Sequence, residues 1–111
     1  MKNLIAAVLV FVSFNAFGQN KFIGKWVSND TTTFLFVKEV NGSLEFTNYD
    51  PENNESFEEI VLRQLPDKIN TTFYRPETDW SLDVTYHLHN ENTLVADCFG
   101  SYYGQIIYTR L

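Results

Sequence analysis

Polar and apolar side chains alternate with a period of two residues along most of the chain after Gln19. The longest example runs from Trp80 to His89, where the apolar positions on one face are Trp80, Leu82, Val84, Tyr86 and Leu88. A period of two is typical of a strand with one buried face and one face in water. No helical period is sustained after Gln19, so the sequence predicts an all-β protein.

Turn residues divide the chain into short segments of this kind. Asn41-Gly42, between two such segments, is a strong hairpin signal. Eight strands joined by short turns favour an antiparallel up-and-down meander closed into a small barrel, because closure removes both free sheet edges. A two-sheet β-sandwich is the alternative. The predicted strands are residues 21–28, 32–40, 43–49, 57–65, 69–75, 80–89, 93–99 and 105–111.

The N-terminal segment has the pattern of a secretory signal peptide. Lys2 precedes an apolar run, and Ala16-Phe17-Gly18 places small residues at a cleavage site. The run is shorter than the ~20 residues that a membrane-spanning helix needs. We therefore expect a signal peptide over residues 1–18 and one domain over residues 19–111. The domain is then secreted or periplasmic, without membrane insertion after signal removal.

Composition narrows the function classes. The 111 residues are 44% hydrophobic and 16% aromatic, which is typical of a folding chain, and the net charge is −6. An acidic balance argues against nucleic acid as a partner. The single cysteine, Cys98, excludes an internal disulfide and a multi-cysteine zinc site. Cys98 alternates with Leu94 and Ala96, so we expect it to point inward as an inert small side chain.

Two short motifs lie at the ends of the predicted domain. The first strand carries Gly24-Lys25-Trp26, and the last strand ends with Arg110. This pairing resembles the calycin superfamily of lipocalins, fatty-acid-binding proteins and avidins. The resemblance implies that Arg110 packs across the Trp26 ring, next to Gly24, where the first and last strands close the barrel. It also implies a small hydrophobic ligand.

Two other groups of residues are candidates for chemistry. His87 and His89 share one face of a strand at a spacing that suits a shared metal, but a solvated outer face has the same pattern. No third ligand is evident, so we predict no metal and no cofactor.

The acidic side chains around 50–56 are interpreted as a surface charge run; they are Glu52, Glu55, Glu58 and Glu59.

No nucleophile–base pair is evident in the sequence, so we predict a protein that is not an enzyme. The expected role is binding of a small apolar or amphipathic molecule inside the barrel. The predicted inward ligand contacts are Phe34, Phe36, Trp80, Leu82, Val84 and Tyr86. The alternative is a secreted protein-binding module, such as an inhibitor or a surface-assembly component, with a solid core and function on its loops. Four tyrosines either line a barrel mouth or pack on the sheet; they are Tyr74, Tyr102, Tyr103 and Tyr108.

Overall fold

The computed structural model describes residues 21–30 and 32–111. The predicted signal peptide, residues 1–18, lies outside the described residues. The described part of the chain contains eight strands and no helix, and each strand lies within two or three residues of a predicted one. The strands are β1 (Gly24–Ser28), β2 (Phe34–Val40), β3 (Ser43–Asp50), β4 (Glu55–Leu65), β5 (Lys68–Arg75), β6 (Trp80–Asn90), β7 (Thr93–Gly100) and β8 (Gly104–Arg110).

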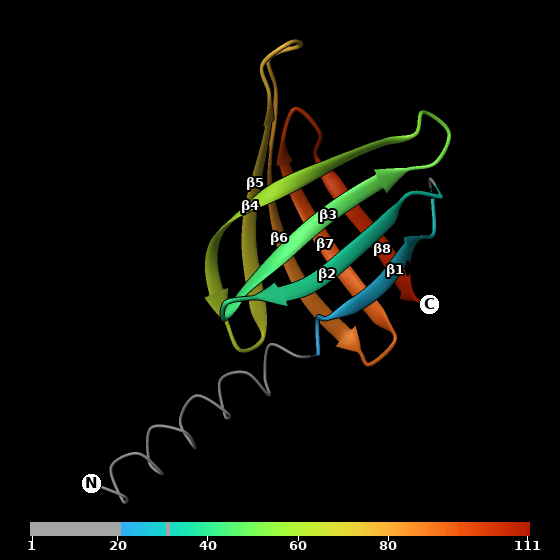
Figure 1. The fold of residues 1–111 in the computed structure, drawn as a ribbon, viewed down its shortest axis with the longest axis vertical. Helices are drawn as coiled ribbons and strands as arrows, with labels where there is room; N and C mark the ends of the chain where they lie inside the picture. Colours follow the sequence, from blue (N-terminus) through green and yellow to red (C-terminus); the bar gives the residue numbers. More distant parts are fainter. Residues whose placement is uncertain (1–20, 31) are drawn as a thin grey trace, which may run out of the picture.

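The strands form a closed antiparallel up-and-down barrel, in which each strand pairs with its neighbours in sequence. Closure comes from the pairing of β1 with β8, where Trp26 lies opposite Arg110 and Ser28 opposite Tyr108 (Figure 1). The predicted eight-stranded barrel is therefore confirmed, and the alternative β-sandwich is wrong. No helix among the described residues is long and apolar enough to cross a membrane.

Turn chemistry explains the hairpin between β2 and β3. Asn41 and Gly42 have φ angles of 52° and 83°. Positive φ at both central residues belongs to the turn whose twist matches two right-twisted strands, and asparagine and glycine tolerate it best. The turn sets the register in which Val40 pairs with Ser43 and Phe36 with Thr47.

The core fills the barrel between the strands with alternate side chains. Phe46 and Tyr86 stack at its centre, with ring centroids 4.7 Å apart. Leu35 and Val37 are the core residues of β2, exposed by 0% and 3%. The predicted inward direction of Phe34 and Phe36 is therefore wrong.

Phe34 and Phe36 lie on the outer face of β2, because successive side chains in a strand point to opposite faces. They stack there with centroids 6.3 Å apart, and the Lys25 ammonium lies 5.9 Å from the Phe36 ring. Both faces of β2 carry apolar side chains in this segment. The alternation of the sequence therefore did not distinguish the inner face from the outer one.

One end of the barrel is closed by Trp26 and Arg110. The Trp26 indole is fully buried and donates a hydrogen bond to the Phe22 carbonyl at 2.9 Å. The Arg110 guanidinium lies 4.1 Å from the ring centroid and donates hydrogen bonds to the carbonyls of Lys21, Ile23 and Glu91. One side chain thus ties β8 to the segment before β1 and to the turn after β6.

Gly24 leaves the space that this guanidinium occupies. Its φ is 148°, and a Cβ added there would lie 2.7 Å from Arg110 Nη1. A side chain at this position would therefore meet both the strained backbone and the guanidinium. The structure places all three predicted closure residues, Gly24, Trp26 and Arg110, at the junction of β1 and β8.

Candidate functional site

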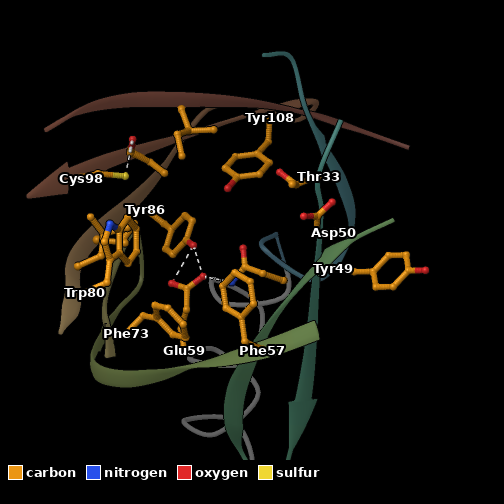
Figure 2. Close-up of a pocket in the computed structure, with 15 residues that line it drawn as sticks. Thr33, Tyr49, Asp50, Phe57, Glu59, Phe73, Trp80, Tyr86, Cys98 and Tyr108 are labelled. Atoms are coloured by element: carbon orange, nitrogen blue, oxygen red, sulfur yellow. Dashed lines mark hydrogen bonds between the residues drawn. The ribbon is translucent and has the colours of Figure 1, made fainter. Parts of the chain in front are cut away.

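A cavity of about 150 Å³ lies inside the barrel, and its lining includes neither Trp26 nor Arg110. Strands β3 to β8 and the segment before β2 supply its lining. Its lining residues lie toward the strand ends joined by the β1–β2, β3–β4, β5–β6 and β7–β8 connections, which lie at one end of the barrel (Figure 1). Figure 2 shows the lining side chains. The lining combines an apolar wall with a small number of polar groups.

The apolar wall is built from three aromatic side chains. Phe57 and Phe73 lie with ring centroids 4.5 Å apart, and Phe73 meets Trp80 edge-on at 6.1 Å. These rings come from β4, β5 and β6, and they are brought together by antiparallel pairing of those strands. Leu82 and Val84 continue the wall toward the core.

Arg75 backs this wall near its end. Its guanidinium carbon lies 5.6 Å from the Phe57 ring centroid and 5.9 Å from that of Phe73. Its Nη2 atom also lies 3.8 Å from Glu55 Oε2. Arg75 is thus occupied by two rings and an acid, and it is not part of the cavity lining.

The polar side of the cavity is centred on Glu59, which β4 carries into the barrel. Glu59 is only 9% exposed. Its Oε1 atom accepts hydrogen bonds from the Thr71 hydroxyl at 2.5 Å and from the Tyr86 hydroxyl at 2.8 Å. Its Oε2 atom accepts from Asn48 Nδ2 at 2.5 Å, and Tyr86 also lies 2.6 Å from it (Figure 2). The interpretation of Glu59 as part of a surface charge run is therefore wrong.

Three donor hydrogens make four contacts with this carboxylate, two on each oxygen. Asn48, Thr71 and Tyr86 bring three donor hydrogens, because the single Tyr86 proton is shared between both oxygens. An ionised carboxylate has about four acceptor sites, so a further donor can bind where the shared Tyr86 proton moves to one oxygen and leaves the other. No ion pair joins Glu59 to a lysine, arginine or histidine in residues 21–30 and 32–111.

Glu59 changes the ionisation of its neighbours. Burial is the main cause that raises the pKa of Tyr86 well above its usual value, and the Glu59 charge adds to it. The same two causes, in the same order, raise the pKa of the Cys98 thiol to about 11 and raise that of Tyr108. All three groups are therefore neutral near pH 7, so none of them places a second negative charge beside Glu59.

The Tyr108 hydroxyl points toward the middle of the cavity (Figure 2). Tyr108 is only 4% exposed. The described part of the chain gives this hydroxyl no hydrogen-bond partner, whereas every fully enclosed side-chain nitrogen or oxygen there has one. Tyr108 is thus a buried polar group that faces open space, and a bound molecule or water would satisfy it.

The predicted ligand contacts fall into two groups. Trp80, Leu82, Val84 and Tyr86 line the cavity together, while Phe34 and Phe36 do not. Sequence reasoning missed Glu59 and the aromatic pair Phe57 and Phe73. The alternation through β4 carried a signal, because Phe57, Glu59 and Val61 share one face. An acid on an otherwise apolar face is more informative than an acid in a run of acids.

The remaining candidates lie elsewhere. His87 is on the outer face of β6, where its Nδ1 atom lies 3.7 Å from Asp97 Oδ2, and His89 is exposed. Within the described ranges, no group of three or more His, Cys, Asp or Glu side chains is arranged to hold a metal ion. Cys98 is 2% exposed and lines the cavity, and of the four tyrosines only Tyr108 does so.

This arrangement is suited to holding a small molecule. Its apolar wall would bury a ring or a short hydrocarbon, while Glu59 and Tyr108 would fix the orientation of a polar group. Comparison of the chain with protein families, curated proteins and solved structures finds no match.

Proposed function

We propose that this chain is an exported, lipocalin-like barrel that binds a small amphipathic molecule in its cavity. The lipocalin-like part of the proposal rests on the up-and-down barrel and on the Arg110 guanidinium over the Trp26 ring. The binding part rests on one observation: a preformed cavity with an aromatic wall and one buried polar cluster. No catalytic step and no cofactor is part of the proposal.

The volume of the cavity limits the size of the ligand. Pockets for drug-sized molecules are roughly 300–1,000 Å³, whereas a cavity near 150 Å³ suits a molecule the size of benzene. The cavity here has about 150 Å³. We therefore expect a ligand with a single ring or a short branched chain, and a longer molecule would leave its remainder outside the barrel.

Titration with 2-phenylethanol tests this function. The molecule carries one ring and one hydroxyl, and binding is measured by calorimetry and by amide chemical-shift changes. We expect saturable binding with the largest shifts on β4, β5 and β6. Absence of saturation, or shifts confined to the outer surface, would contradict the proposal.

A pair of matched variants locates the binding site. Val84→Phe fills the cavity, because Val84 lines it and is 4% exposed. Val40→Phe makes the same change at an exposed position beside the β2–β3 turn. Binding should be lost in the first variant and kept in the second, with circular dichroism showing that both are folded. Equal binding by the two variants would place the ligand outside the cavity.

A second function, binding of a protein partner, is favoured by the outer face of β4. Ile60 and Leu62 are 65% and 62% exposed there, side by side on the pleat. Isolated exposed apolar residues are ordinary, but neighbouring ones on one strand can form part of an interface. This alternative is supported if the titration shows no binding and Ile60→Ser Leu62→Ser removes self-association or partner binding.

A further inference from the structure

We infer that the cavity selects small organic cations, specifically arylalkylamines, over neutral and anionic molecules of the same shape. This inference rests on the proposed function and defines the chemical class of its ligand. In it, the ammonium group donates hydrogen bonds to Glu59 and Tyr108. The ring lies against Phe57, Phe73 and Trp80.

The acidic side chains of the lining favour a cationic ligand. Glu59 and Asp50 are both lining residues, and the lining contains no lysine, arginine or histidine. Taking a carboxylate out of water is costly unless a cation or several hydrogen bonds compensate for it. Three donors compensate Glu59 in part, and no cation among the described residues completes the pair. A cationic ligand would supply the missing charge.

The hydrogen-bond acceptors of the site favour an ammonium group. The Tyr86 proton bridges both Glu59 oxygens, so its movement to one of them frees an acceptor site on the other for a ligand. The Tyr108 hydroxyl oxygen is a further acceptor that faces the cavity without a partner in the described part of the chain. A primary ammonium group has three donors and no acceptor. Its hydrogen-bonding pattern therefore matches these two groups.

The aromatic wall of the cavity favours a ligand that carries a ring. Aromatic rings attract a cation through their faces and bury an apolar ring at the same time. Phe57, Phe73 and Trp80 form such a surface across the cavity. A bare metal ion would gain little from this wall, and a carboxylate would be repelled by Glu59 and Asp50. The combination favours an amine attached to a ring.

The test compares three molecules of nearly the same shape at pH 7 in calorimetric titrations of the purified protein. They are 2-phenylethylamine, 2-phenylethanol and phenylacetate. A charge-assisted hydrogen bond to a buried acid suggests that the amine binds roughly 10- to 100-fold more tightly than the alcohol. The carboxylate should bind more weakly than the alcohol.

Two isosteric variants isolate the charge of Glu59. Glu59→Gln removes that charge inside the cavity, and Glu58→Gln removes one charge at the neighbouring exposed position on β4. The preference for amine over alcohol should fall to less than about threefold in the first variant. It should be unchanged in the second. Tyr108→Phe should weaken amine binding without abolishing it, which provides a second test if Glu59→Gln does not fold.

The outcomes separate the two proposals. If the alcohol binds as tightly as the amine, or if Glu59→Gln keeps the preference, the cation inference is overturned and the proposed function stands. If the carboxylate binds most tightly, the inference is overturned in the same way. If none of the three molecules binds, both the inference and the proposed function fail.

Discussion

Replacing Arg110 with alanine tests whether one side chain holds the closed end of the barrel. The guanidinium lies 4.1 Å from the Trp26 ring centroid. It donates to the carbonyls of Ile23 at 2.8 Å, Lys21 at 2.6 Å and Glu91 at 2.8 Å. Among the three hydrogen bonds, only the one to Ile23 is partly buried, and the other two are exposed. The variant removes all four contacts at once.

The expected loss follows from the setting of each contact. A cation over an indole contributes about 1 kcal/mol when partly exposed. The partly buried charged hydrogen bond to Ile23 contributes about 1.5 kcal/mol, and the two exposed bonds about 0.5 kcal/mol together, since water replaces them. Arg110→Ala should therefore lower the free energy of unfolding by about 3 kcal/mol, out of roughly 5–13 kcal/mol for a domain of this size.

Urea unfolding followed by tryptophan fluorescence measures this loss, and thermal unfolding should show a Tm lower by roughly 12–24 °C. Arg110→Lys keeps the cation but loses the planar fork, so about half of the loss is expected. Arg63→Ala is the control, because Arg63 is exposed on β4, and it should change stability by less than about 0.5 kcal/mol. A loss below about 1 kcal/mol for Arg110→Ala would refute this account of barrel closure.

Three other predictions concern Gly24, the Cys98 thiol and the buried groups whose pKa is raised. Gly24→Ala should lower the free energy of unfolding by roughly 1–3 kcal/mol, because an added Cβ meets both a positive φ and the guanidinium; unchanged urea unfolding would contradict this. Cys98 should react with iodoacetamide at pH 8 about 100-fold more slowly than in the urea-unfolded chain, because its pKa rises from 9.0 to about 11; equal rates would contradict this. Stability should be fully present near pH 8 and fall as the pH rises beyond 9, because the unfolded chain releases the protons of Cys98, Tyr86 and Tyr108 before the folded one does. A urea midpoint that is the same at pH 8 and pH 10.5 would contradict it.

The strands and their order were predictable because local and global preferences agree. In β6, a period-two pattern spans the whole strand, and in the hairpin after β2 the Asn41-Gly42 turn fixes the register. An even number of short strands with short turns then favours closure. The contact between Arg110 and Trp26 was implied by the family resemblance, since no local pattern indicates which residues meet across 84 positions of sequence, from Trp26 to Arg110.

The site was harder to predict because two strands carry apolar residues on both faces. On β2, Phe34 and Phe36 alternate with Leu35 and Val37, so hydrophobicity alone does not choose the inner face. On β4, exposed Ile60 and Leu62 alternate with Val61, and a register shift lies between Val61 and Arg63. The inward direction of Glu59 is set by strand pairing across the barrel, which brings it to Thr71 and Tyr86.

The barrel holds the Arg110 cation at its closed end and the Glu59 carboxylate in its cavity, and we expect the two to act independently. At the closed end, the Arg110 cation contacts carbonyls and an indole. In the cavity, the Glu59 carboxylate accepts hydrogen bonds but forms no ion pair with a described residue. The two groups share no hydrogen-bond partner, so their effects on stability should add. Arg110→Lys combined with Glu59→Gln should lose the sum of the single losses to within about 0.5 kcal/mol.

The ligand preference of the cavity should likewise be independent of Arg110. Arg110→Lys alone should keep the preference for 2-phenylethylamine over 2-phenylethanol, because Arg110 contacts neither the cavity wall nor Glu59. A coupling above about 1 kcal/mol in the stability cycle would contradict this division. So would loss of the amine preference on changing Arg110. Either result would mean that the core between Trp26 and Tyr86 transmits strain from one end of the barrel to the other.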